Sequence, residues 1–189
     1  MQEGRSLGKR AARARNREMP IDRAALYAIF ERLNIGWRTV EHRPVFTVEE
    51  GRDLKAGMPG GHSKNLFLKD KKDALSLAVA HCDTAVDLVG LGRAIGARGR
   101  LSFGRPELMT ATLGVAPGSV TPFALANAGA RALSHVIVDR ALLAYDPVWF
   151  HPLSNDASTA VAPEGLLAFI ADCGFEPRVV NLAAPLRAA

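Results

Sequence analysis

Three short stretches hold the groups with which this chain could do chemistry. Lys64 lies where a glycine-rich segment leads into the apolar run "NLFLKD". The stretch 118–122, "GSVTP", pairs a glycine that permits close backbone approach with a proline that fixes the exit, so its N–H groups can face a ligand. His151 and Asn155 flank a proline-containing bend between two apolar runs. Each stretch also has an ordinary explanation: a solvated strand-end lysine, a simple turn, and polar groups that cap strand ends.

Other patterns fail a test of context or spacing. The stretch 61–65, "GHSKN", lacks the last glycine of a nucleophile elbow and precedes a strand instead of following one. The stretch 90–96, "GLGRAIG", is out of register for a dinucleotide fingerprint, and its glycines fall inside an expected helix. Because neighbouring strand residues point to opposite faces, the stretch 81–83, "HCD", is not expected to converge, and Cys82 is expected to be a buried thiol. The histidines show no metal-binding spacing, so we expect neither a metal nor a cofactor.

The composition is that of one globular domain. The chain has 189 residues, 48% of them hydrophobic and 23% charged, and no apolar run approaches the roughly 20 residues of a membrane helix. Its two cysteines predict reduced thiols in a cytoplasmic protein. The net charge of +5 resides in residues 1–17, where six basic residues accompany one acidic residue. We expect a basic, disordered extension over residues 1–18, which either steers toward RNA or is dispensable, and one domain over residues 19–185.

Hydrophobic periodicity and turn residues predict a mixed α/β domain with a curved sheet of about seven strands and surrounding helices. Proline and glycine mark most of the expected helix ends. The segment 114–129 contains no acidic or basic residue and is expected to be a loop with an apolar lining. The expected helices are 20–34, a short one from Thr47, 87–97, 106–114, a turn or two within 140–145, and 163–173. The expected strands include a hairpin of 64–70 and 74–81, and single strands at 37–42, 101–103, 134–139, 148–152, 158–162 and 176–182.

The order of several motifs is more specific than any one of them. "HRPVFTVEE", "SKNLFLKDKKDALSLAV", "LGVAPGSVTPFAL", "WFHPLSNDASTAV" and "EPRVVNL" follow one another along the chain. In this order they resemble the YbaK/ProX family of trans-editing aminoacyl-tRNA deacylases, related to the editing insertion of bacterial prolyl-tRNA synthetases. The resemblance covers about residues 20–182 and is strongest to ProX-type prolyl-tRNA editing proteins. It implies a single editing domain of that fold.

The resemblance also implies roles for individual residues. Lys64 matches the functional lysine of the family, whose cation would engage the ester carbonyl or a phosphate of the tRNA acceptor end. Gly118 and Pro122 match a G-x-x-x-P loop that would clasp the aminoacyl group, and His151 matches a pocket histidine. These four are the expected catalytic residues. Phe150 would set the pocket size unless strand alternation turns it into the core. The expected substrate-binding residues are Asn65, Ser119, Val120, Thr121, Phe150 and Asn155.

The implied reaction is hydrolysis of alanine that is mis-attached to proline tRNA. A synthetase pocket shaped for proline cannot strongly reject a smaller amino acid, because a missing methylene is worth only about 1–3 kcal/mol. The sequence shows no nucleophile with a base and no carboxylate pair, which suits the mechanism implied for the family, in which the vicinal hydroxyl of the tRNA and a bound water supply the reactivity. The implied partners are tRNA and a prolyl-tRNA synthetase, without a membrane.

Three alternatives remain open at this point. The chain could be a non-catalytic, regulatory binding module of the same fold. It could instead be a deacylase for cysteine, serine or threonine esters, because sequence does not give the volume of the pocket. A nucleotide-binding oxidoreductase built on "GLGRAIG" is the third alternative.

Overall fold

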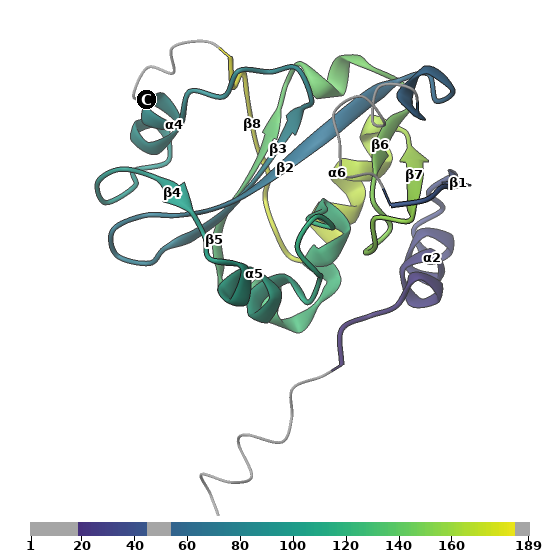
Figure 1. Ribbon diagram of the computed structural model, residues 1–189, viewed down its shortest axis with the longest axis horizontal. Coiled ribbons are helices and arrows are strands. Elements are labelled where there is room, and N and C mark those ends of the chain that lie inside the picture. The colour runs from purple at the N-terminus through teal and green to yellow at the C-terminus, as the bar shows by residue number, and fades with distance from the viewer. Residues whose placement is uncertain (1–18, 45–53, 184–189) are drawn as a thin grey trace, which may run out of the picture.

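The computed structural model describes residues 19–44 and 54–183 (Figure 1). Within these residues no helix is long and apolar enough to cross a membrane. The helices are α2 (Arg23–Arg32), α4 (Leu88–Ala94), α5 (Pro106–Leu113) and α6 (Pro163–Asp172), with 3₁₀ segments η1 (Pro122–Ala126), η2 (Ala128–Ala132) and η3 (Leu142–Ala144). The strands are β1 (Trp37–Glu41), β2 (Gly61–Lys69), β3 (Leu75–His81), β4 (Ser102–Phe103), β5 (Leu133–Asp139), β6 (Val148–Phe150), β7 (Ala157–Val161) and β8 (Arg178–Val180).

The strands form one mixed sheet in the order β1-β7-β6-β2-β3-β5-β8, with β4 paired to β2 off this path. β2 and β3 form an antiparallel hairpin that pairs Ser63 with His81 and Lys69 with Leu75. β6 runs parallel to the start of β2, whereas β4 is antiparallel to its end. β2 is therefore the strand that joins the two halves of the sheet, as Figure 1 shows. The predicted mixed α/β class and the predicted hairpin are confirmed.

Helices cover both faces of the sheet (Figure 1). On one face, which we call the helical face, α2, α5, α6 and η1 pack on the strands around the main hydrophobic core. On the other, the α4 face, Leu91 and Ile95 pack on Leu68. Met58 covers Trp149 farther along that face. Both faces of β3 are thus buried, which explains why β3 reads as a nearly continuous apolar run.

An aromatic cluster on the helical face anchors the segment 114–126. Phe123 of η1 is fully buried, and its ring meets those of Phe30, Phe150 and Phe169 edge to face at 5.1–5.4 Å. Edge-to-face packing is the favoured arrangement of aromatic pairs. The segment was expected to be a loop throughout, but it contains η1 and η2 because Phe123 draws it into the core.

Most helices begin or end at the proline and glycine residues that were expected to mark their ends. α5 begins at Pro106 and ends before Gly114, which caps it in the left-handed conformation at φ 68°. α6 likewise begins at Pro163. The first helix was expected to start at Pro20, but it starts at Arg23 because the Asp22 carboxylate accepts a hydrogen bond from the N–H of Ala25. The expected helix from Thr47 and the extension 1–18 lie outside the described residues.

A buried carboxylate ties together the strand ends on one edge of the fold. Asp139 at the end of β5 is 0% exposed. It accepts a hydrogen bond from the Thr84 hydroxyl at 2.6 Å and from the N–H groups of His81, Ala141 and Leu182 at 3.2–3.3 Å. These bonds connect the segment after β3 and the C-terminal end of the domain to β5.

We expect Asp139→Ala to lower the free energy of unfolding by about 3 kcal/mol, because it leaves several buried donors without an acceptor. Urea denaturation measures this difference. Glu31→Ala on the exposed side of α2 is the matched control and should change stability by less than about 0.5 kcal/mol. Equal unfolding midpoints for the two variants would show that Asp139 is not a structural tie.

Candidate active site

A cavity of about 180 Å³ opens on the α4 face, where β1, β7, β6 and β2 lie side by side. Pockets for drug-sized ligands typically measure about 300–1,000 Å³, so this one suits a small group. Its walls combine apolar side chains with several that can form hydrogen bonds. The lining residues are His42, Leu54, Lys55, Met58, His62, Ser63, Trp149, Phe150, His151 and Ser158.

Strand alternation places Lys64 on the same face as the cavity. Asn65 turns to the helical face, where its Nδ2 donates to the Val120 carbonyl at 2.9 Å. His62 and Lys64 therefore lie on the α4 face, about 7 Å apart along β2. Lys64 is half-buried, and no ion pair or hydrogen bond links its ammonium group to another of the described residues. Lys64 does not itself line the cavity but is the next residue on that face after His62.

The strand registers align Lys64 with two polar residues of the cavity wall. β6 pairs in parallel with β2 and antiparallel with β7. Continued by one residue past Phe150, these registers place His151 between Lys64 and Ser158. Because neighbouring strands lie about 4.8 Å apart, the backbones at Lys64 and Ser158 are about 10 Å apart with His151 between them. The sheet thus brings two predicted residues, Lys64 and His151, into one row.

His151 is held in its neutral form with a defined tautomer. Burial lowers the pKa of His151, and the charge of nearby His42 acts in the same direction, whereas the hydrogen bond to the Ala157 carbonyl opposes the shift. Nδ1 lies 3.1 Å from that carbonyl, and a carbonyl can only accept, so Nδ1 carries the proton. Nε2 of the neutral ring is then a hydrogen-bond acceptor.

Two further histidines border the cavity in equally defined states. The Nδ1 of His42 lies 2.9 Å from the Arg43 carbonyl, and its Nε2 lies 3.0 Å from the Ser158 hydroxyl. His62 donates from Nε2 to the Met58 carbonyl at 2.8 Å, and its ring stacks on Trp149. Burial lowers the pKa of His62.

The loop 118–122 lies on the helical face, and none of its residues lines the cavity. Gly118 adopts φ 87°, a left-handed conformation that favours glycine. A Cβ placed there would lie 3.6 Å from Nδ2 of Asn155, so the loop passes close to the bend after β6. Within the described part of the chain, the N–H groups of Gly118 and Val120 have no hydrogen-bond partner, whereas that of Ser119 donates to the Ala116 carbonyl. The structure therefore brings Asn65, the loop and Asn155 together.

Two expected substrate-binding residues mainly support this loop. Thr121 is fully buried, and its hydroxyl accepts from the N–H of Phe123 to cap η1, which begins at Pro122. Phe150 is 2% exposed and packs edge to face on Phe123, so alternation does turn its ring into the core even though the residue borders the cavity. Asn65 keeps its Oδ1 buried without a partner among the described residues.

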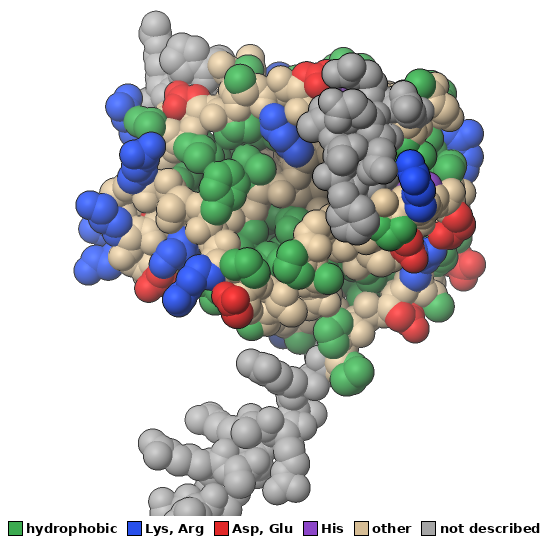
Figure 2. All heavy atoms as spheres, in the orientation of Figure 1, with side chains coloured by type: hydrophobic (Ala, Val, Ile, Leu, Met, Phe, Trp, Pro, Cys, Tyr) green, Lys and Arg blue, Asp and Glu red, His purple; other side chains and the backbone are tan. Residues whose placement is uncertain are grey.

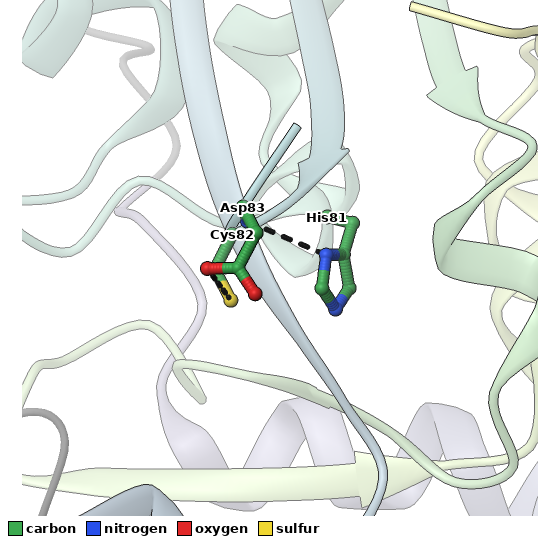
Figure 3. A group of neighbouring side chains, drawn as sticks. All are labelled: His81, Cys82 and Asp83. Carbon is green, nitrogen blue, oxygen red and sulfur yellow. Dashed lines mark hydrogen bonds between the residues drawn. The ribbon is translucent and has the colours of Figure 1, made fainter. Parts of the chain in front are cut away.

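The stretch His81–Cys82–Asp83 converges, contrary to expectation (Figure 3). β3 ends at His81, so strand alternation no longer applies to the two residues of the following turn. Their donor atoms lie within 4.8 Å of one another, as a metal site would require. Hydrogen bonds explain the arrangement: Cys82 donates to the Asp83 carboxylate, and the Asp83 N–H donates to Nδ1 of His81. Cys82 is half-buried, and burial raises the pKa of its thiol, which disfavours the thiolate that metals bind.

Sequence reasoning missed most of the cavity wall. His42 and Ser158 belong to motifs that carried the family resemblance, but no role was assigned to either residue. His62 stands two residues before Lys64, and this spacing alone places both on one face of a strand. The pairing of His42 with Ser158 depends on the register of β1 with β7, which are more than 100 residues apart in sequence.

Comparison with known proteins identifies the family of the chain. The family model for the aminoacyl-tRNA editing domain matches residues 42–169. A Bos taurus protein named prolyl-tRNA synthetase associated domain-containing protein 1 is 37% identical over 164 residues, covering 84% of this chain and 94% of its own length. The prolyl-tRNA editing protein ProX of Acetoanaerobium sticklandii is 33% identical over 143 residues, covering 75% of this chain and 86% of its own.

A solved structure shares the fold. The crystal structure of a proposed trans-editing enzyme for prolyl-tRNA synthetase superposes with a TM-score of 0.64 at 22% identity, covering 85% of this chain and 95% of that one. At this identity the likeness concerns the fold, and it confirms the predicted editing-domain architecture. The family match and the relatives together show that the chain belongs to the aminoacyl-tRNA editing domain family.

Proposed function

We propose that this protein hydrolyses the ester of a mischarged tRNA in trans, with alanine on proline tRNA as the preferred substrate. The observation that carries the proposal is the position of Lys64. Lys64 is half-buried, its ammonium group has no protein counter-ion among the described residues, and it lies in one row with His151, which lines a small cavity. A cation held there is available for an electron-rich group of a substrate.

The site residues can share the tasks of ester hydrolysis. A water attacks the carbonyl carbon, the bond to the ribose oxygen breaks, and the amino acid and the tRNA leave. The Lys64 cation engages the carbonyl oxygen or the adjoining phosphate. The vicinal ribose hydroxyl relays the proton of the water to the leaving ribose oxygen, and the neutral His151 offers Nε2 as an acceptor to the aminoacyl group.

The cavity supports a small amino acid as the substrate. Its volume of about 180 Å³ fits an aminoacyl group better than a nucleotide. The ProX relative is named a prolyl-tRNA editing protein, and we propose that alanine is the amino acid removed here. Serine, cysteine and threonine esters are of similar size, so they form the second candidate class. The helix α4 contains Gly90 and Gly92 in its interior, which is the wrong context for the nucleotide-binding alternative.

Binding of tRNA is supported by positive charge on the visible face in Figure 2, which shows basic side chains gathered at the end where the β2–β3 turn and β4 lie. Lys71, Arg98 and Arg100 are exposed there, and the N–H of Lys71 donates to the Arg98 carbonyl. Arg38 lies over the Trp149 ring at 5.0 Å, nearer to the cavity. We propose that these groups and the basic residues 1–18 contact tRNA phosphates, with a prolyl-tRNA synthetase as a further partner.

We expect Lys64→Ala to slow deacylation of Ala-tRNA(Pro) at least about 100-fold, because it removes the cation that lies in the row with His151. The measurement is the rate of loss of each ester in a panel of tRNAs charged with alanine, serine, cysteine or threonine. Lys64→Met, which keeps the length of the side chain, should be equally slow, and both variants should melt as the wild type does. Full activity of Lys64→Ala would remove Lys64 from the site, and no activity of the wild type on any ester would favour a non-catalytic module.

We expect His151 to titrate below the ordinary histidine value of about 6.5, because burial disfavours its charged form. An acceptor that must be neutral then leaves kcat/KM constant above that pH and loses rate only as the pH falls further. An NMR titration of the ring protons, assigned with His151→Gln, measures the pKa, and the pH profile of kcat/KM measures its consequence. A His151 pKa above 6.5 would contradict the expectation.

We expect deletion of residues 1–18 to weaken tRNA binding and to flatten its salt dependence. Each phosphate contact contributes about 0.7–0.9 to the slope of log affinity against log salt concentration, so losing several contacts should lower the slope by at least about 2. Filter binding at a series of salt concentrations gives both values. The charge-reversed variant of Lys71, Arg98 and Arg100 is the comparison in the folded domain. Unchanged affinity and slope after the deletion would exclude the extension from the interface.

A further inference from the structure

The β7 end of the cavity presents hydrogen-bond acceptors. The Arg43 carbonyl accepts the proton of His42 Nδ1, so in this tautomer Nε2 accepts from its other neighbour, the Ser158 hydroxyl. Since the Ser158 proton is used in this bond, its Oγ turns lone pairs to the cavity. Nε2 of His151 is an acceptor for the same reason, because Nδ1 donates to the Ala157 carbonyl.

These two acceptors are close together and rigidly held. Ser158 is 8% exposed and lies inside β7, opposite Val40 of β1. The N–H of His42 donates to the Asp156 carbonyl at 2.9 Å, which extends the β1–β7 pairing past the end of β1. The rings of His42 and His151 are 6.4 Å apart, so Ser158 Oγ and His151 face the same part of the cavity.

An acceptor-only wall is complementary to a group that only donates. In the proposed substrate that group is the α-ammonium of the aminoacyl ester, which has N–H donors and no lone pair. We infer that Ser158 Oγ and His151 Nε2 bind this ammonium group, and that His42 is a positioning residue that holds the Ser158 hydroxyl in the accepting orientation. The inference rests on the proposed function and names the part of the substrate that this end of the cavity recognises.

The charges around the site are arranged to permit a cation there. Lys64 lies on β2, two strands away from Ser158 and with His151 between them. Lys55 borders the cavity but is exposed to solvent. The carboxylate of Asp156 forms an ion pair with Arg23 at 2.6 Å and accepts from Ser154, so it is already engaged. The ammonium group therefore meets neutral acceptors, and orientation of the donors decides how well it is bound.

This arrangement has a consequence for specificity. The ammonium of alanine has three N–H donors, whereas the ring nitrogen of esterified proline has two and carries an additional carbon. A site that orients its acceptors toward a primary ammonium loses at least part of the contact when proline is bound, and polar groups left unpaired in a pocket are costly. Recognition of the ammonium would thus help to spare correctly charged proline tRNA, beyond what the volume of the cavity achieves.

Binding of stable substrate analogues tests the inference. The probes are 3′-amino-3′-deoxyadenosine acylated with alanine, with lactate, in which a hydroxyl replaces the ammonium, or with proline. Isothermal titration at pH 7.2 keeps α-amino groups largely protonated and histidines largely neutral. We expect the wild type to bind the alanyl probe about 10- to 100-fold more tightly than the lactyl probe, with the prolyl probe also weaker than the alanyl one.

Substitutions test which residues produce the preference for the alanyl probe. Ser158→Ala should reduce the preference for the alanyl over the lactyl probe to less than about 3-fold, and Ser158→Thr, which keeps the hydroxyl, should retain it. His42→Phe should lose the preference, whereas His42→Gln, whose amide oxygen can still accept from Ser158, should restore part of it. Ser134→Ala, at an exposed position of β5, is the matched control and should bind as the wild type does.

The outcomes separate the inference from the proposed function. Equal affinities of the wild type for the alanyl and lactyl probes, no binding of either probe, or an unchanged preference in Ser158→Ala would each overturn the inference. If the ester is hydrolysed but the two probes bind equally, the function stands and the inference fails. If the probes are discriminated but no ester is hydrolysed, the ammonium site stands and the proposed catalysis fails.

Discussion

The site depends on the pairing of one strand, β2, with three others. β3 pairs with most of its length, β6 with its beginning and β4 with its end. A strand held on both sides cannot shift its register without breaking several ladders at once, and a shift of one residue would turn every side chain to the other face. Lys64 keeps its place on the α4 face for this reason. The same constraint sends Asn65 to the opposite face, where it holds the loop 118–122.

One row of residues across the sheet carries a cation at one end and a hydrogen-bond acceptor at the other. A lysine without a protein counter-ion among the described residues lies on β2, and a serine hydroxyl directed by a histidine lies on β7. Main-chain carbonyls determine the proton positions of the histidines at 42, 62 and 151, because a carbonyl can only accept. Backbone geometry thus specifies which side-chain atoms donate and which accept. Such preorganised dipoles need not rearrange when a substrate binds.

Local sequence signals predicted those helix ends and strands whose conformation depends mainly on neighbouring residues in the chain. Pro106 and Gly114 bound α5 as expected, and the alternation of charged and apolar runs gave the β2–β3 hairpin. Predictions failed where a distant or neighbouring group intervened. Asp22 moved the start of α2 past Pro20 by capping it, Phe123 drew an expected loop into the core as η1, and the end of β3 let His81 and Asp83 converge. Only the contact of Phe123 is made by tertiary packing, whereas the Asp22 cap and the turn after β3 are local contacts.

The sequence alone determined the family and the mixed α/β class, because the order of the motifs and the hydrophobic pattern can be read without a structure. It also gave the candidate residues Lys64, Gly118, Pro122 and His151. Only the tertiary structure decided what surrounds them. The registers of β2, β6 and β7 put Lys64, His151 and Ser158 in one row, and the register of β1 brought His42 to the Ser158 hydroxyl. Strand pairing joins segments that lie far apart in the chain, and no local pattern encodes the register at which they meet.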